Sequence, residues 1–130
     1  MKRRELMLGA AATVLLAGTV RAADQVTFHF YGAEDCPPCM AFKRNHLADV
    51  QAEGRANGVI VEENVITRTR DVPKIGVYGD RDPILRLAAP QLERVYPPIF
   101  FVSQGGRIAS VHGPDWSAAL REARRLAGLT

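Results

Sequence analysis

Hydrophobic and polar residues alternate along the chain soon after its amino-terminal segment. Residues 26–31 read Val-Thr-Phe-His-Phe-Tyr, and this alternation of β-branched and aromatic residues predicts a strand that ends in a loop over residues 32–35. From Pro37 onward apolar residues recur at helical spacing, which predicts a first helix that ends at the glycines before residue 59. Residues 59–66 predict a second strand, although acidic residues interrupt its apolar character.

A long loop and a second helix are expected next. Residues 67–81 contain one proline and two glycines and predict a loop. Asp82 followed by Pro83 starts a helix, because the carboxylate can accept free amide hydrogens and proline loses nothing at the first helical position. This helix must end before the Pro97-Pro98 pair.

The last part of the chain predicts a hairpin and a final helix. Residues 99–103 are apolar and predict a buried strand, which Gln104-Gly105-Gly106 connects through positive-φ residues to a strand over residues 107–111. Asp115 then caps a helix whose apolar side begins at Trp116. The predicted order is therefore β-α-β-α-β-β-α.

The amino-terminal segment differs from the rest of the chain. Lys2-Arg3-Arg4 precedes an uncharged stretch over residues 6–20, and small residues around Arg21 stand where a signal peptidase cleaves. An uncharged stretch of about 15 residues is shorter than the roughly 20 that span a membrane. We expect residues 1–22 to be a cleaved signal peptide, residues 23–130 to form one domain, and the mature protein to be periplasmic. The Sec and twin-arginine export routes both fit Arg3-Arg4.

The net charge of the chain excludes two classes of binding partner. The chain has 130 residues with 17 Lys and Arg, 14 Asp and Glu, and a formal net charge of +3. Four of the basic residues and one of the acidic residues fall within residues 1–22, so the expected mature domain is neutral. A neutral domain without a basic run has no electrostatic footprint for nucleic acid or for an anionic membrane surface.

The two cysteines are the strongest chemical signal, and they stand as Cys36-Pro37-Pro38-Cys39 at the predicted strand-to-helix junction. There Cys36 would lie exposed over free amides and the positive helix end, which favour the thiolate that attacks disulfides. Cys39 lies one turn into the helix, close enough to bond Cys36 and release a mixed disulfide. The spacing predicts a redox pair. A disulfide that only staples the helix start and a soft-metal site that uses both thiols are the alternatives.

With the C-x-x-C motif at this junction, the chain resembles the thioredoxin superfamily over essentially all of residues 23–130. The resemblance rests on the first strand, the C-x-x-C motif, the proline before residues 99–102, the Gly105-Gly106 hairpin and Gly113 before the final helix. It implies a minimal thioredoxin fold of the α/β class, with a central four-stranded mixed sheet flanked by three helices. It implies a redox-active disulfide with no other cofactor and no metal.

The resemblance also implies where a partner protein binds. Pro98 falls on the position of the family's cis proline, which faces the two cysteines and shapes the partner site. The Tyr96–Pro97 bond is the other candidate for the cis bond. Pro97 lacks the amide hydrogen that the residue before the cis proline ordinarily offers to substrate. Tyr31, at the strand end, is expected either to line the rim of this site or to pack on the first helix.

Five residues that depart from the family pattern are expected to tune the cysteines. Glu34 and Asp35 stand beside the first cysteine and disfavour its thiolate, which should raise its pKa. Pro37 and Pro38 remove two amide hydrogens that could have stabilised the thiolate. Both features favour a reductant over a strong oxidant. His29 stands near the place of the family's buried carboxylate and could accept the proton of the second cysteine; a histidine that fills the core or faces solvent is the alternative.

Together these features predict an enzyme, an exported thiol:disulfide oxidoreductase that exchanges its Cys36–Cys39 disulfide with protein substrates in the reducing direction. The resemblance implies exported proteins with disulfides as substrates and a membrane electron donor as the source of electrons. We expect a monomer. The competing hypotheses are a module that binds or delivers Cu(I) through the C-x-x-C and a non-catalytic adaptor with a thioredoxin fold.

Overall fold

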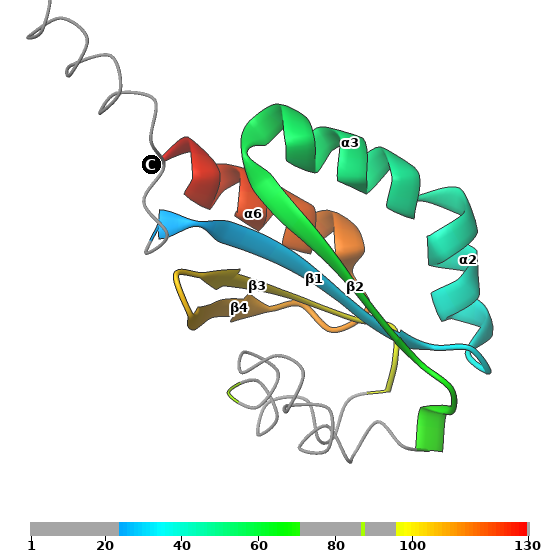
Figure 1. The fold of residues 1–130 in the computed structure, drawn as a ribbon. Helices are drawn as coiled ribbons and strands as arrows, with labels where there is room; N and C mark the ends of the chain where they lie inside the picture. The colour runs from blue at the N-terminus through cyan, green and yellow to red at the C-terminus, as the bar shows by residue number, and fades with distance from the viewer. Residues whose placement is uncertain (1–23, 71–86, 88–95, 130) are drawn as a thin grey trace, which may run out of the picture.

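The structure is a computed structural model that describes residues 24–70, Leu87 and residues 96–129 (Figure 1). The signal peptide expected over residues 1–22 lies outside the described residues. So do most of the loop expected over residues 67–81 and, apart from Leu87 and Tyr96, the helix expected to end before Pro97.

Four strands form one mixed sheet in the order β2-β1-β3-β4. Strand β1 pairs in parallel with β2 and antiparallel with β3, and β3 pairs antiparallel with β4. The β3–β4 hairpin turns at Gly105 and Gly106, whose φ angles of 59° and 89° are the positive values that the sequence predicts for this turn. The strands are β1 (Val26–Ala33), β2 (Val59–Ile66), β3 (Ile99–Gln104) and β4 (Arg107–Val111).

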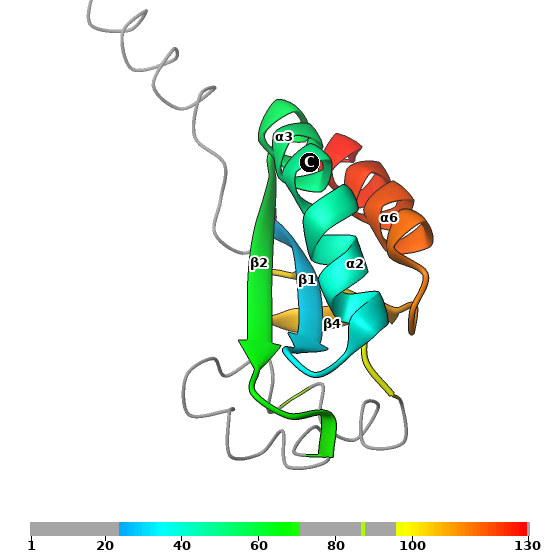
Figure 2. The same ribbon diagram turned by 90° about the vertical axis from the view of Figure 1, so that its right-hand side faces the viewer.

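The three described helices lie on the same face of this sheet, as two perpendicular views show (Figures 1 and 2). Helices α2 and α3 form the crossover between the parallel strands β1 and β2, and α6 follows β4. This mixed sheet with three flanking helices confirms the fold class predicted from the sequence, that of a minimal thioredoxin fold. The helices are α2 (Pro37–Asn45), α3 (Leu47–Asn57) and α6 (Trp116–Gly128).

The single first helix that the sequence predicts is in fact two helices, with a break at His46. Phe42 and Leu47 are both buried against the core, at 4% and 5% exposure. In one continuous helix, residues five positions apart would point about 140° away from each other. The break, where His46 has φ −131° and ψ −28°, turns the chain so that both side chains reach the core.

Strand β1 is also longer than predicted. Gly32 and Ala33, which were expected in a loop, pair with Val65 and Ile66 of β2 and extend the strand. The loop before Cys36 is therefore reduced to two residues beyond the strand. The end of β1 and the start of α2 are held close together in this way.

An aromatic core lies between the sheet and the helices. The Phe42 ring of α2 packs against Phe30 and Phe100, with a centroid distance of 4.7 Å to each. Phe28 lies 5.7 Å from Phe100, and all four rings are buried. Burial of four aromatic side chains is a major source of stability, and it fixes α2 on the carboxyl end of β1.

Candidate functional site

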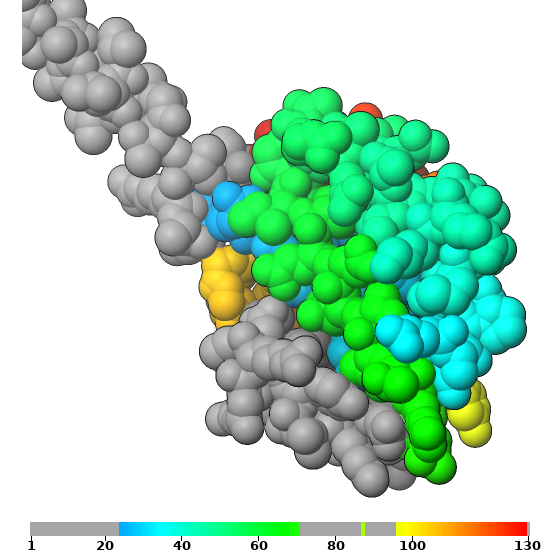
Figure 3. Space-filling view, turned by 45° about the vertical axis from the view of Figure 1, so that its right-hand side comes forward, coloured from blue at the N-terminus to red at the C-terminus, as the bar shows by residue number. Residues whose placement is uncertain are grey.

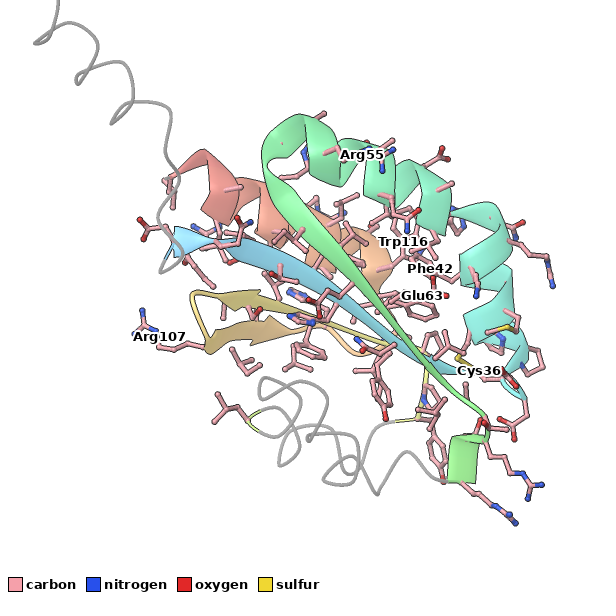
Figure 4. All side chains as sticks on the ribbon, viewed as in Figure 1. Cys36, Phe42, Arg55, Glu63, Arg107 and Trp116 are labelled. Carbon is pink, nitrogen blue, oxygen red and sulfur yellow. A yellow bond between two sulfur atoms is a disulfide. The ribbon has the colours of Figure 1, made fainter. Side chains whose placement is uncertain are left out.

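Cys36 and Cys39 form a disulfide at the start of α2, with a distance of 5.2 Å between their Cα atoms. Figure 4 shows Cys36 at the turn that joins β1 to α2. Cys36 is the residue that caps the helix, and Pro37 and Pro38 occupy its first two positions, where proline costs no hydrogen bond. The pairing that the C-x-x-C spacing predicts is therefore present.

Short-range contacts hold this turn against the end of β1. The Cys36 amide donates to the Ala33 carbonyl at 3.2 Å, and the Cys36 carbonyl accepts from the Met40 amide at 3.1 Å. Gly32 permits the close approach of the helix, because a Cβ atom at this position would lie 3.0 Å from the Cβ of Cys39 and 2.9 Å from the Phe30 ring. A glycine is thus required where β1 passes beneath the second cysteine.

The Cys36 sulfur touches one amide and one carbonyl. Its Sγ accepts a hydrogen bond from the Cys39 amide at 3.3 Å, and it lies 3.5 Å from the carbonyl oxygen of Pro97. The expectation of an exposed first sulfur is wrong: Cys36 is 5% exposed and Cys39 is fully buried. On reduction, the Cys39 amide stabilises a Cys36 thiolate, whereas the Pro97 carbonyl can accept a hydrogen bond only from the protonated thiol.

The segment before β3 lies against the disulfide. The Pro97–Pro98 peptide bond is cis, which is the bond favoured by the sequence, and both prolines are buried. Tyr96 precedes them and is 84% exposed. In the space-filling view the start of α2, in cyan, and the yellow segment before β3 meet at the same edge of the molecule (Figure 3).

Asp35, directly before Cys36, is tied to the segment that follows β2. Its Oδ1 accepts hydrogen bonds from the Thr69 amide at 2.7 Å and the Thr69 hydroxyl at 2.8 Å. These two bonds hold the pKa of Asp35 below its ordinary value of 3.8. The carboxylate therefore stays charged beside Cys36 throughout the pH range in which a thiol titrates.

An ion pair lies one helical turn beyond Cys39. Lys43 Nζ lies 2.6 Å from Glu63 Oε1 on β2. The Glu63 hydrogen bond, and to a lesser degree the charge of Glu34, hold the pKa of Lys43 above its ordinary value of 10.5. Glu34 also joins the loop to β2, because its amide donates to the Ile66 carbonyl at 2.8 Å.

His29 lies on the other face of the sheet from the cysteines. Residues two apart on a strand share a face, and Phe30 and Gly32 face Cys39, so His29 points away from it. The His29 ring is 2% exposed, stacks on Phe101 at 4.3 Å, and has its Nε2 2.7 Å from the hydroxyl of Ser103. The expected role of His29 as proton acceptor for Cys39 is therefore wrong, and the alternative of a histidine that fills the core is correct.

Tyr31 is also placed differently from the expectation. It is fully buried and shares the His29 face of β1, so it neither lines a partner site nor packs on α2. The alternation of the strand decides this position. Because β1 continues through Ala33, Tyr31 is an interior residue of the strand and not its end.

A groove of about 540 Å³ lies next to the C-x-x-C motif, and Pro38 of that motif lines it. Its lining also includes residues of α2 and the segment from Tyr96 to Pro98. Phe42 and Trp116 line the groove too, and their rings lie 5.9 Å apart (Figure 4). His46 is a further lining residue and stacks on Trp116 at 4.5 Å.

The sequence does not mark Thr69, Phe42, His46 or Trp116 as residues of the site. A helical apolar face, which Trp116 begins, and an isolated histidine such as His46 carry no chemical pattern. Thr69 belongs to a predicted loop, and only its contact across 34 residues with Asp35 shows its role. The sequence holds no signal for this contact, because water can hydrate an exposed carboxylate without a protein donor.

No family model matches the chain, and no curated protein matches it. Within residues 24–70 and 96–129, no set of three or more His, Cys, Asp or Glu side chains is grouped to hold a metal ion. No helix in the described part of the chain combines the length and apolar character that a membrane crossing needs.

Proposed function

We propose that this chain is a thioredoxin-like thiol:disulfide oxidoreductase that exchanges its Cys36–Cys39 disulfide with disulfides of protein substrates. The observation that carries the proposal is the placement of a C-x-x-C disulfide at the first turn of a helix, with the Pro97 carbonyl oxygen 3.5 Å from its first sulfur. A loop of two intervening residues closes little chain entropy, so a purely structural role would gain little stability.

The exchange balances in two steps. The Cys36 thiolate of the reduced protein attacks one sulfur of a substrate disulfide, forms a mixed disulfide, and releases the other substrate sulfur as a thiolate that takes a proton from solvent. The Cys39 thiolate then attacks the Cys36 sulfur, which re-forms the Cys36–Cys39 disulfide and releases the second substrate thiol. Two electrons pass from the cysteine pair to the substrate, and an external dithiol or electron donor must restore the reduced pair.

Three features around Cys36 support the reducing direction. The charged Asp35 carboxylate disfavours a neighbouring thiolate, and Thr69 keeps that carboxylate charged. The two prolines leave the Cys39 amide as the donor to the sulfur within the first turn of α2. The Pro97 carbonyl favours the protonated thiol. A reduced form with a less stabilised thiolate gives up electrons more readily.

The proposal includes the setting in which the enzyme works. Residues 1–22 have the pattern of a signal peptide, so we propose a periplasmic protein that acts as a monomer on exported proteins with disulfides. A membrane protein that supplies electrons would keep the pair reduced, because the periplasm is oxidising.

Trapping of the mixed disulfide tests the proposed function. A Cys39→Ser variant of the full chain should accumulate a covalent adduct with a disulfide-containing protein such as oxidised insulin, and dithiothreitol should release it. The matched Cys36→Ser variant should form far less adduct, because Cys39 is fully buried. No adduct with either variant, together with tight stoichiometric Cu(I) in the reduced wild type, would favour a metal-binding module instead.

A further inference from the structure

We infer that the groove beside the disulfide selects substrates that carry an aromatic side chain within about three residues of their reactive cysteine. This inference rests on the proposed function, because the disulfide exchange places the substrate at Cys36. The groove adds a second contact to that covalent one. The occupant is thus a short extended segment of the substrate protein.

The groove is continuous with the reacting sulfur. Pro38 belongs to the C-x-x-C motif and lines the groove, and Pro97 lines it while its carbonyl oxygen lies 3.5 Å from Cys36 Sγ. A substrate cysteine bonded to Cys36 therefore starts at the groove's edge. An extended chain advances about 3.3 Å per residue, so one to three residues place a side chain inside the groove.

The chemistry of the walls favours an aromatic side chain. Phe42, His46 and Trp116 line the groove with three neighbouring rings, and the His46 and Trp116 rings are stacked with an interplanar angle of 26°. None of the described residues that line it is Asp, Glu, Lys or Arg. An aromatic substrate ring can meet these rings edge-to-face or offset-stacked and bury apolar area. A volume of about 540 Å³ holds such a side chain with its neighbours.

The backbone of the groove offers few hydrogen-bond donors. Pro38, Pro97, Pro98 and Pro114 all line it, and none of them has an amide hydrogen. A substrate strand cannot pair with these residues as it would with a free sheet edge. Most of its affinity must therefore come from side-chain burial, which makes the identity of the neighbouring side chain decisive.

Two matched peptides test the inference. The reduced full chain, freed of dithiothreitol, reacts with the symmetric disulfide of Gly-Ser-Trp-Gly-Cys-Gly-Ser or of the same peptide with Ala in place of Trp. Released peptide thiol is followed over a single turnover by chromatography. We expect the Trp peptide to react about tenfold faster.

Matched variants assign this preference to the groove. Ala41→Glu places a charge in the groove wall and should bring the ratio of the two rates close to one. The control Ala48→Glu makes the same change at an exposed position of α3 outside the groove, and it should keep the wild-type ratio. Tyr96→Ser, at an 84% exposed rim residue, should lower the ratio without disturbing the core and serves if Ala41→Glu fails to fold.

Each remaining outcome contradicts the inference in a different way. Equal rates with both peptides would show that exchange occurs without aromatic selection, which overturns the groove's role and leaves the proposed function intact. No reaction with either peptide would overturn both. Equal rates with a wild type that sediments as a dimer, and an Ala41→Glu variant that sediments as a monomer, would assign the groove to a second copy of the chain instead.

Discussion

Cys36 lies between groups with opposite effects on its sulfur. The Cys39 amide donates to Sγ and favours a thiolate, while the Asp35 charge and the Pro97 carbonyl favour the protonated thiol. Pro37 and Pro38 offer no amide hydrogen to the sulfur, and the Met40 amide donates to the Cys36 carbonyl instead. The two groups that disfavour a thiolate are the basis of the proposed reducing direction.

Asp35→Asn should make Cys36 more acidic. Removal of the neighbouring negative charge should lower the pKa of the Cys36 thiol and raise the rate of alkylation of the reduced protein near pH 7. The pH dependence of alkylation by iodoacetamide measures this change. Asp49→Asn, on an exposed part of α3, is the control and should leave the profile unchanged. An unchanged profile for Asp35→Asn would show that Asp35 does not tune the sulfur.

Thr69→Val should make the free energy of unfolding depend less on pH in the acid range. Thr69 lowers the pKa of Asp35 in the folded protein, so its stabilising effect is present above 3.8, the ordinary value, and is lost as pH falls through the folded pKa. The variant should unfold more easily in urea than the wild type at pH 7, and this difference should shrink at acid pH. Thr67→Val, two residues earlier and exposed, is the control. A difference that persists at acid pH would contradict the assignment.

At the scale of elements, the crossover from β1 to α2 decides the geometry of the site. Strand β1 extends to Ala33, a two-residue loop follows, and Cys36 caps the helix. The glycine at position 32 then lets Cys39 sit directly against the strand. The reactive pair is positioned by a strand and a helix, which hold side chains more rigidly than a loop would.

Gly32→Ala should disturb this contact. The added Cβ would lie 2.9 Å from the Phe30 ring and 3.0 Å from Cys39 Cβ, so the helix or the ring must move. We expect a loss of about 1–3 kcal/mol in the free energy of unfolding, measured in urea. Gly128→Ala is the matched control, because a Cβ there meets nothing within 4 Å. A Gly32→Ala variant as stable as the control would contradict the close packing of α2 on β1.

The strands and the cysteine pair could be predicted from the sequence because their signals are local. Alternation marks β1, the Gly105-Gly106 pair marks the hairpin, and the C-x-x-C spacing predicts the disulfide. The break at His46 has no such local signal. Phe42 and Leu47 are five residues apart and would not share one face of a continuous helix, and this matters only because both side chains pack into the core. The positions of His29 and Tyr31 depend on which face of β1 meets α2, which strand alternation alone leaves undecided.

In the molecule as a whole, the sheet separates the cysteine pair from a buried histidine. The disulfide and the groove lie on the face that carries the helices, and the buried His29–Ser103 pair lies on the opposite face. His29 Nδ1 also lies 3.5 Å from Glu62 Oε2 on β2. We expect this second cluster to stabilise the fold without affecting the disulfide.

Ser103→Ala tests this separation. Loss of the Ser103 hydroxyl removes its 2.7 Å hydrogen bond with buried His29, and we expect a cost of about 1–3 kcal/mol in the free energy of unfolding. The reduction potential of the disulfide should equal that of the wild type. A large change in potential would show that the two faces are coupled. Urea unfolding and equilibration with glutathione measure the two quantities on the same sample.

The reduction potential of the Cys36–Cys39 pair decides whether the protein is a reductant or an oxidant of its substrates. The full chain is equilibrated in glutathione buffers of known composition, and the free thiols are counted by alkylation and mass spectrometry. The charges and prolines around Cys36 predict a potential near or below about −220 mV, in the range of thioredoxin and the glutaredoxins. A potential near about −120 mV, that of a strong periplasmic oxidant, would contradict the reducing direction.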